Sequence, residues 1–449
     1  MPALRPTLPA EPTPDRSDPN DMDPATATSS GASGSAATFE EMAEEMNEEM
    51  AEEMSEVERR SDGLPAEMWA LTFDRSREEW ACSKGLIKER VPTPRLDDPN
   101  GADAGLVLIK VKYAGFCGSD RGIWWRKAFG QMILGSLDEE GKDRRVVGHE
   151  LLGEVVAVGS GVALKPGDVI STESHIVCGV CYQCQVGDLH VCADDRIIGI
   201  SRDGCFAEYL KLPAKALWPT DLSRIRAEVG AVQEPFGNAV HACQATPLAG
   251  QRVAIIGCGT IGLFALLVAR GMGARQIIGI DTNPHHLELA RRLGADQVIC
   301  PPSREGLAAH QSDAAVIAEV RALTEGVGVD VAMEMAGFHS SLNNAIKMAR
   351  RGGHVVLFGV KDGDAVVEDL HRIIMNGLQL HGVVGRQIFG TWEITRALLE
   401  DRSNGVADAV WEVILNEGQG TIIDIADWAP EPFEAMMSAH PKVVIRFAG

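Results

Sequence analysis

Four cysteines lie in one short stretch, at Cys178, Cys181, Cys184 and Cys192, and they constrain the fold more than any other feature of the chain. Because they are so close in sequence, their thiolates can converge on a single ion without a large fold to position them. Four cysteine ligands with no open position are what a structural zinc site requires. The alternatives are disulfides or four unrelated thiols, but disulfides need an oxidising compartment and nothing in the sequence points to secretion. We therefore predict a structural zinc lobe over residues 175–195.

The overall charge of the chain is strongly negative, which limits its partners. The 449 residues carry a formal net charge of −22, and this argues against nucleic acid and anionic membranes as partners. Positions 1–63 hold 16 acidic and 4 basic residues, a net charge of −12, so about −10 remains for the rest of the chain. The sequence has no uncharged apolar run long enough to span a membrane, and its acidic start is unlike a transit peptide. We expect a cytoplasmic protein of two or three domains.

Residues 1–63 differ in composition from the rest of the chain. Positions 1–38 are rich in Pro, Ala, Ser, Thr, Asp and Gly, and such a segment cannot bury enough apolar surface to become ordered. In residues 39–58 a methionine recurs at every fourth position, which on a helix forms a narrow stripe. That stripe could belong to a partner-binding helix or to a marginal, solvated one. We predict a disordered, acidic N-terminal extension over residues 1–63.

Two regions of different periodicity follow the extension. Residues 64–240 contain alternating apolar segments separated by glycine-containing turns, which is typical of a mostly β domain. Between residues 241 and 384, apolar strands alternate with helical patterns, which favours a parallel sheet covered on both faces. Residues 385–449 carry further helical patterns and end in the strand pattern KVVIRF. The fold class is therefore α/β, with a β-rich domain and a doubly wound parallel sheet.

A glycine-rich turn, Gly257-x-Gly259-x-x-Gly262, follows an apolar strand pattern and precedes an apolar helix pattern. The first glycine permits the tight turn, the second lets the backbone approach a pyrophosphate, and the third lets the helix pack on the strand. The next predicted strand ends at Asp281, whose carboxylate can bind the ribose hydroxyls and would repel a 2′-phosphate. A glycine-rich turn without a cofactor is the alternative. The pattern predicts a dinucleotide site that prefers NAD to NADP.

A second group of metal-binding residue types surrounds the cysteine stretch in the sequence. Cys117 follows a predicted strand, His149 and Glu150 lie in VVGHELLGE, and Glu234 lies in VQEPFGNAVH. A thiolate, an imidazole and a carboxylate can hold zinc with an open position for an alcohol oxygen. Alternatively, the cysteine and histidine are ordinary core residues, and Glu150 orients His149 instead of binding metal. We predict a catalytic zinc held by Cys117, His149 and one or both of Glu150 and Glu234, which could exchange.

Together these motifs resemble those of the zinc-dependent medium-chain dehydrogenase/reductase family. Over residues 66–449 the chain carries GFCGSD, GHE, the four-cysteine stretch, EPFGNAV and GxGxxG in that family's order. The resemblance implies a GroES-like catalytic domain, formed by 64–240 and the returning segment 385–449, with a Rossmann NAD-binding domain at 241–384. It also implies two zinc ions per chain, one catalytic and one structural, NAD as cofactor, an alcohol substrate and a homo-oligomer, either a dimer or a tetramer.

Within this family, SHIVCGVCYQC, GCFAEYL, EPFGNAVHA and GVVGRQIFGTWE are similar to the L-threonine 3-dehydrogenases. The resemblance implies oxidation of a secondary alcohol, with L-threonine as the first candidate substrate. It also implies that Ser119 passes the substrate proton away from the zinc. Besides the three glycines and Asp281, the positions implied to contact NAD are Ile261, His286, Phe358, Gly359, Val360, Val383 and Val384.

The sequence departs from the threonine dehydrogenase pattern at the outer proton relay. Gly122 stands where that subfamily places a histidine, and the loop from Ile123 to Arg145 is longer than its counterpart. The stretch CGSDRGI is closer to sugar dehydrogenases of the same family, so a polyol or aldose is the second candidate substrate. A non-catalytic zinc- and NAD-binding regulatory protein is the alternative from another functional class. Arg121 and Arg126 either bind a substrate carboxylate or are solvated loop charges.

Overall fold

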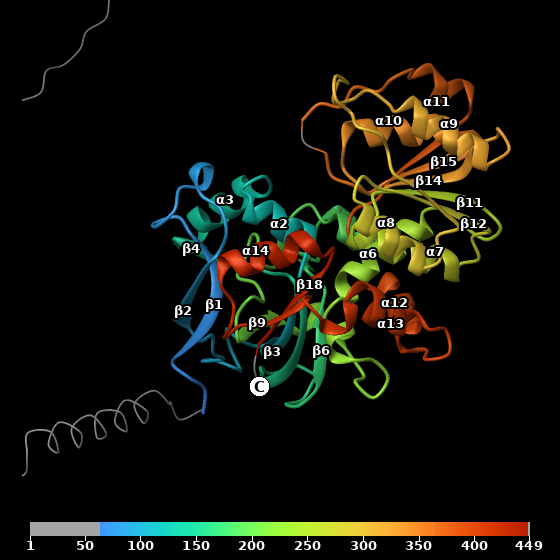
Figure 1. The fold of residues 1–449 in the computed structure, drawn as a ribbon. Helices are drawn as coiled ribbons and strands as arrows, with labels where there is room; N and C mark the ends of the chain where they lie inside the picture. The colour runs from blue at the N-terminus through green and yellow to red at the C-terminus, as the bar shows by residue number, and fades with distance from the viewer. Residues whose placement is uncertain (1–62, 362, 448–449) are drawn as a thin grey trace, which may run out of the picture. The chain divides into compact units, whose positions relative to one another are not determined.

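The computed structural model describes residues 63–361 and 363–447. The predictions for the acidic extension and its methionine stripe concern residues outside this part of the chain, except for Gly63. The described chain starts with a β-rich region, continues through alternating strands and helices, and returns to a strand that joins the first region (Figure 1). This order confirms the α/β class predicted from the sequence.

The β-rich region is built from sheets that are mostly antiparallel. A seven-stranded sheet has the order β10-β6-β5-β3-β18-β17, with β9 also paired to β3. Strand β18 lies near the end of the chain and pairs antiparallel with β3, so the returning segment completes this sheet. The other two sheets have the orders β2-β1-β4 and β7-β8. The strands of this region are β1 (Glu67–Asp74), β2 (Ile87–Pro92), β3 (Leu106–Phe116), β4 (Arg144–Val146), β5 (Glu150–Val158), β6 (Val169–Thr172), β7 (His175–Ile176), β8 (Arg196–Ile197), β9 (Tyr209–Pro213), β10 (Leu217–Pro219), β17 (Ile422–Asp424) and β18 (Val443–Arg446).

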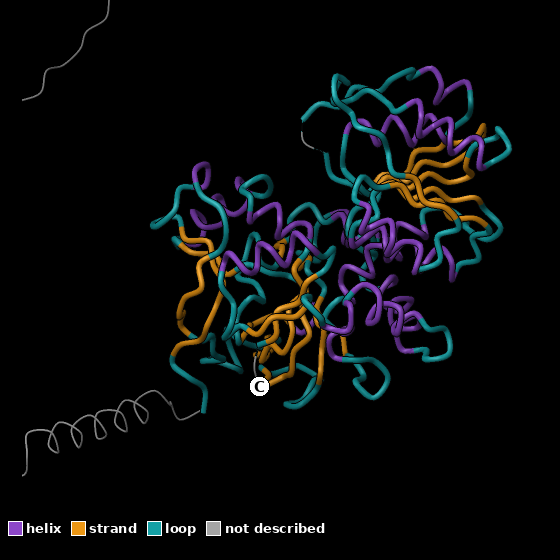
Figure 2. The backbone as a smooth tube through the Cα atoms, viewed as in Figure 1, coloured by secondary structure: helices purple, strands orange, loops and turns teal. Residues whose placement is uncertain are grey.

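A six-stranded parallel sheet forms the second region, in the order β13-β12-β11-β14-β15-β16. This is the strand order of a doubly wound dinucleotide-binding fold. Alternate residues of β11 enter different apolar clusters, Val253 and Ile255 on one face and Ala254 and Ile256 on the other, and helices cover both faces (Figure 2). The strands are β11 (Arg252–Ile256), β12 (Gln276–Ile280), β13 (Gln297–Ile299), β14 (Val329–Glu334), β15 (Ala349–Leu357) and β16 (Gln379–Gly382).

Two segments differ from the sequence-based expectation. The long segment expected to be a loop contains a helix, Gly130–Glu140, because Ile133 and Leu137 are four residues apart and both are fully buried. The pattern SLNNAIKMARRGG predicts a helix that runs through ARRGG, but the helix ends at Met348, and Ala349 already belongs to β15. Glycine is the poorest helix former after proline, and the glycine pair of that stretch lies in the strand.

The helices position the loops of both regions. None of the helices in the described part of the chain is long and apolar enough to cross a membrane. Helices α6, α7 and α8 lie on one side of the parallel sheet, and α9, α10 and α11 lie on the other (Figure 1). The helices are α2 (Gly118–Trp124), α3 (Gly130–Glu140), α4 (Tyr182–Val186), α5 (Ala227–Gly230), α6 (Gln233–Gln244), α7 (Thr260–Gly271), α8 (Pro284–Arg292), α9 (Ala314–Leu323), α10 (His339–Met348), α11 (His371–Met375), α12 (Gly390–Glu400), α13 (Val406–Ala409) and α14 (Pro430–Ala439).

Candidate active site

Three of the predicted zinc ligands come together at the end of two paired strands. Cys117 follows β3 directly, and Glu150 is the first residue of β5, which pairs with β3 so that Gly115 lies opposite Glu150. The ligand atoms of Cys117, His149 and Glu150 all lie within 4.8 Å of one another. One sulfur, one imidazole nitrogen and one carboxylate oxygen at this separation fit a zinc ion with an open position.

The Asp120 carboxylate orients this group. Its Oδ2 accepts a hydrogen bond of 2.8 Å from the Cys117 backbone N–H, and its Oδ1 lies 3.4 Å from His149 Nδ1. Burial lowers the pKa of His149, but the Asp120 carboxylate and the Cys117 sulfur outweigh it, so that pKa is raised well above its usual value. A carboxylate on one ring nitrogen leaves the other nitrogen available to a metal. This role of Asp120 was not predicted from the sequence, although Asp120 directly follows Ser119 in GFCGSD.

Glu150 is fully buried beside an equally buried lysine. Its Oε2 accepts a hydrogen bond from the Lys442 ammonium, which also donates to the Phe116 carbonyl at 3.2 Å. No described residue bonds Glu150 Oε1. Gly115 makes room for the carboxylate, because a Cβ at that position would lie 1.9 Å from Glu150 Oε2. A buried carboxylate oxygen without a partner fits a metal ligand, since such an oxygen is costly to leave unpaired.

Glu234 lies outside the three-residue group. It stands in the first turn of α6, and its Oε1 accepts a hydrogen bond of 2.8 Å from the Ser174 hydroxyl and lies 2.5 Å from Arg386 Nη1. Its Oε2 is buried and has no hydrogen-bond partner among the described residues. Glu234 is therefore held by Arg386 in the present arrangement, with one oxygen still available.

Arg386 forms a buried network that the sequence-based analysis missed. Its guanidinium donates to both Glu173 carboxylate oxygens, to Asn238 Oδ1 at 2.8 Å and to the Ser174 hydroxyl at 2.8 Å. Trp392 Nε1 donates to Glu173 at 2.9 Å. Burial raises the pKa of Glu173, but the Arg386 guanidinium outweighs it, and that pKa lies below its usual value. Both Arg386 and Trp392 lie in GVVGRQIFGTWE, yet nothing local in that stretch indicates Glu173 as a partner.

Ser119 and Gly122 lie on the first turns of α2, next to Cys117. Ser119 is half-buried, and its hydroxyl has no hydrogen bond to a described residue, so it is free to bond a substrate. At Gly122 an added Cβ would lie 2.7 Å from the Ala128 Cβ, because the chain folds back after the helix. No side chain, and so no relay histidine, fits at position 122 in this packing.

The two arginines considered for a substrate carboxylate have other partners. Arg121 donates to the carbonyls of His440 and Pro441, at 2.7 and 3.1 Å. Arg126 donates to Glu78 at 2.9 Å and stacks over Phe73 and Trp80. Their donors therefore tie together distant parts of the chain, and neither arginine is a solvated loop charge.

The four cysteines of the predicted structural zinc lobe also come together, with their sulfurs within 4.8 Å of one another. Cys192 Sγ lies 3.5 Å from Cys178 Sγ and 3.8 Å from Cys181 Sγ. Backbone N–H groups lower the pKa of Cys181 to about 6, whereas burial and the neighbouring Cys181 raise the pKa of Cys184 to about 12. Sulfurs this close cannot all be thiolates unless a cation compensates their charge, which is the condition that zinc satisfies.

The glycine-rich turn links β11 to α7 as expected. Gly257 has φ +96°, and at Gly262 an added Cβ would lie 1.9 Å from the Gly257 carbonyl oxygen, so both positions need glycine. Asp281 follows β12, and its Oδ2 accepts a hydrogen bond of 2.7 Å from the Cys258 N–H and lies 3.3 Å from His286 Nδ1. A cavity of about 370 Å³ borders Gly257, Asp281 and Phe338, which is the place where the fold binds a nucleotide.

The other positions implied to contact NAD lie at the same edge of the sheet. Phe358 and Gly359 follow β15, and the Gly359 N–H and the Phe358 N–H both donate to the Glu334 carbonyl at 3.0 Å. Ile261 is the second residue of α7, and Phe358 and Val383 pack partly buried on the core. Val360 and Val384 are 87% and 49% exposed, so they present apolar surface that a bound ring could cover.

Glu334 was missed by the sequence-based analysis, although it shapes this edge. It is fully buried, and its Oε1 accepts hydrogen bonds from the N–H groups of Ala336 and Gly337, at 2.9 and 2.8 Å, and from the Ser341 hydroxyl. Its Oε2 pairs with Lys361. Glu334 thus joins the turn after β14 to the loop after β15, which carries the predicted NAD contacts Phe358, Gly359 and Val360.

Comparisons with known proteins agree with this geometry. Residues 103–222 match the alcohol dehydrogenase GroES-like domain, and residues 260–401 match the zinc-binding dehydrogenase domain. The L-threonine 3-dehydrogenase of Bacillus licheniformis is 38% identical over 70% of this chain and 85% of its own length. The chain belongs to the zinc-dependent medium-chain dehydrogenase/reductase family.

Further relatives fit the same family. The L-threonine 3-dehydrogenase of Pyrococcus horikoshii is 37% identical over 70% of this chain and 83% of its own length. Among solved structures, the alcohol dehydrogenase of Thermus sp. ATN1 is similar with a TM-score of 0.68 and 25% identity, over 84% of this chain and 99% of that one. As a family member the chain is a zinc-dependent oxidoreductase of the alcohol dehydrogenase type that uses NAD.

Proposed function

We propose that this enzyme oxidises the secondary hydroxyl of a β-hydroxy-α-amino acid, with L-threonine as the first candidate. The observation that carries the proposal is the group of Cys117, His149 and Glu150, with the free Ser119 hydroxyl beside it. The similarity to threonine dehydrogenases over 85% of the length of one such enzyme supports the choice of substrate class. The expectations of a homo-oligomer and a cytoplasmic location stay predictions.

In this proposal Cys117, His149 and Glu150 hold the catalytic zinc, and the four cysteines of the lobe hold the structural one. When bound, the catalytic zinc supplies Lewis-acid polarisation of the alcohol oxygen, and NAD supplies the hydride acceptor. Ser119 accepts the hydroxyl proton of the substrate through its Oγ. Because no side chain fits at position 122, the proton leaves Ser119 by water or by the cofactor ribose.

The charges around the site favour an amino acid over a polyol. Glu234 Oε2 is a buried carboxylate oxygen without a partner among the described residues, and it can accept a charge-assisted hydrogen bond from an ammonium group. A polyol has no ammonium group to offer. Arg386 already donates to Glu173, Asn238 and Ser174, so it positions Glu234 instead of binding the substrate.

Spectrophotometric NADH formation by the zinc-replete enzyme tests this proposal. L-threonine, D-glucose, sorbitol and a simple secondary alcohol are compared, with Cys117→Ser as the inactive variant and Cys82→Ser, an exposed cysteine outside both groups, as its matched control. We expect threonine turnover that Cys117→Ser abolishes and Cys82→Ser preserves. Faster turnover of sorbitol or glucose would assign the substrate to the polyol class that CGSDRGI suggests.

Two further measurements separate the remaining alternatives. Metal analysis should give two zinc ions per chain. The Cys192→Ser variant should hold one, because this substitution affects only the four-cysteine lobe. Glu234→Gln should lower kcat/KM for L-threonine more than for a simple secondary alcohol, since only the amino acid carries an ammonium group. One zinc ion per chain with no turnover of any substrate would support the non-catalytic regulatory protein instead.

A further inference from the structure

A cleft of about 580 Å³ lies on the parallel-sheet region, away from the cofactor edge. Its lining includes Ala349, the first residue of β15, as well as Val327 and Asn376, which come shortly before β14 and β16. The amino ends of these parallel strands therefore border the cleft. The glycine-rich turn and Asp281 follow the carboxyl ends of strands in the same sheet. The cleft and the dinucleotide site thus lie at opposite edges of one sheet.

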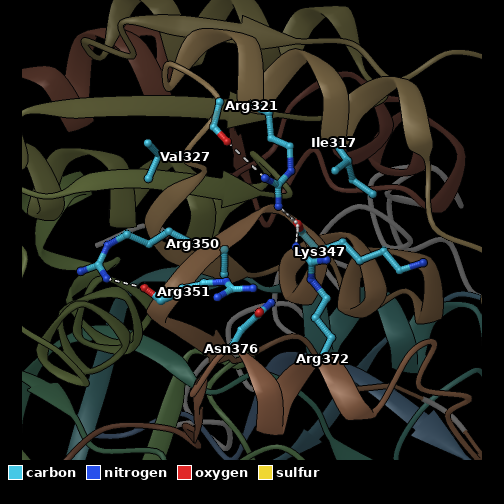
Figure 3. Close-up of a pocket in the computed structure, with 10 residues that line it drawn as sticks. Ile317, Arg321, Val327, Lys347, Arg350, Arg351, Arg372 and Asn376 are labelled. Atoms are coloured by element: carbon cyan, nitrogen blue, oxygen red, sulfur yellow. Dashed lines mark hydrogen bonds between the residues drawn. The ribbon is translucent and has the colours of Figure 1, made fainter.

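Among the described residues, five cations and no carboxylate line this cleft, which we call the cationic cleft: Arg321, Lys347, Arg350, Arg351 and Arg372. Two of the five are neutralised from outside, because Lys347 pairs with Glu368 and Asp369, and Arg350 pairs with Asp330. In Figure 3 the ends of these two side chains point away from the centre of the cleft. No ion pair to a carboxylate is found for the other three arginines within the described residues.

The three unpaired arginines have donors to spare. Arg321 and Arg372 approach the Lys347 carbonyl oxygen together, at 3.1 and 3.2 Å (Figure 3). Arg372 Nε is buried and has no hydrogen-bond partner among the described residues. Arg351 is exposed, and its guanidinium donates to none of them. A buried N–H without an acceptor is costly, so an anion that enters the cleft could satisfy a donor that the described residues leave open.

An ordinary structural role explains only part of this arrangement. Helices α9, α10 and α11 end beside the cleft, and cations near a helix C-terminus are stabilising because the last carbonyls carry partial negative charge. That effect explains why Arg321 and Arg372 donate to carbonyls. It does not explain Arg351, which belongs to β15, or the open Nε of Arg372. Burial and the charge of Arg321 lower the pKa of Arg372; Asp369 opposes this shift, and Arg351 adds to it.

We propose that the cationic cleft binds a small anion that carries phosphoryl groups, at a site separate from the cofactor. The planar guanidinium fork matches phosphate oxygens in pairs, which favours arginine over lysine for such ligands. The positive charge of the three guanidinium groups is similar in magnitude to the negative charge of two phosphoryl groups at neutral pH. The cleft is also large enough for a phosphorylated metabolite, since ligand pockets span about 300–1,000 Å³.

Calorimetric titration of the full-length, zinc-loaded enzyme with fructose 1,6-bisphosphate tests the proposal. Saturating NAD is present throughout, so that the phosphate subsite of the cofactor is filled. We expect one bound molecule per chain, and no heat with fructose, which lacks the phosphoryl groups. Absence of binding at millimolar concentration, or a displacement of NAD, would overturn the proposal. Citrate carries carboxylates and no phosphoryl group. If citrate bound more tightly than fructose 1,6-bisphosphate, the proposed preference for phosphoryl groups would be refuted.

Two substitutions and a matched control locate the site. Arg351→Glu changes an exposed side chain whose guanidinium donates to none of the described residues, so we expect an intact fold and at least about a tenfold loss of affinity. Arg372→Gln should weaken binding to a similar degree. Arg291→Glu reverses an exposed charge elsewhere on the same region and should leave the affinity unchanged. An unaltered NAD-dependent rise in melting temperature checks folding, and unchanged binding in both cleft variants would refute the assignment.

Discussion

Replacing Arg386 by methionine should destabilise the β-rich region, because this guanidinium is the common partner of two buried carboxylates. Arg386 is 2% exposed, and Glu173 and Glu234 are 1% and 2% exposed. Without the guanidinium both carboxylates remain buried, and the donors that the described residues still offer them are the Trp392 N–H, the Ser174 hydroxyl and the His175 N–H. Removing one partner of a buried ion pair costs about 3–5 kcal/mol. Since two pairs are broken together, we expect a loss near the upper end of that range.

Urea unfolding followed by tryptophan fluorescence measures this loss, because the Trp392 indole bonds Glu173 directly. Adding Glu173→Gln to Arg386→Met should recover about 1–3 kcal/mol, as coupled neighbours do in double-mutant cycles. The control is Arg291→Met, which removes an exposed pair with Glu288 and should cost less than about 1 kcal/mol. A loss below about 1 kcal/mol for Arg386→Met, or strictly additive effects in the double variant, would refute the reasoning.

Three other predictions concern the cofactor, the packing of α2 and acid stability. Asp281→Ser should raise KM for NAD about tenfold and reduce the preference over NADP; an unchanged kcat/KM ratio for the two cofactors would contradict it. Gly122→Ala should cost about 1–3 kcal/mol in thermal unfolding by collision with Ala128, and Ala128→Gly should restore the loss; equal melting temperatures would count against the close packing. For Asp330, burial raises the pKa, but the Arg252 N–H and the Arg350 guanidinium outweigh it and the pKa lies below 3.8. The stabilising contribution of the Asp330 carboxylate is therefore present above about pH 4 and is lost as the pH falls through the folded-state pKa. The difference in urea midpoint between the wild type and Asp330→Asn should therefore shrink on acidification. A difference that grows would contradict this sign.

Residues close together in the sequence could be assigned because their spacing alone limits their geometry. Cys178 and Cys192 are 14 residues apart, and the whole cysteine set can converge within one loop. The role of Gly257 and Gly262 could be assigned because both lie between a strand pattern and a helix pattern, so their geometry depends on a single turn. For such motifs, local chemistry is sufficient, and the structure brings their members together as expected.

Partners far apart in the sequence could not be assigned in this way. Lys442 pairs with Glu150 across 292 positions, and nothing in HPKVVIRF marks that lysine as buried. Arg386 bonds Glu173 across 213 positions. These pairings depend on β18 joining β3 and on the loop after β16 reaching Glu173, which are consequences of topology. A sequence pattern predicts the local structure of one segment. It does not indicate which residue of a distant segment will pair with it.

The sequence by itself determined the α/β class, the cysteine lobe, the dinucleotide turn and the types of side chain in the proposed catalytic group. Each of these depends on short-range spacing and on hydrophobic period, which are written into consecutive residues. Only the tertiary structure decided that Glu234 is held by Arg386 and that position 122 has no room for a side chain. It also decided that three arginines, none of them paired with a carboxylate of the described chain, meet at the far edge of the parallel sheet. These features arise because folding places charges from separate segments within a few ångströms of one another in a medium of low dielectric constant, where their pairing energies become large.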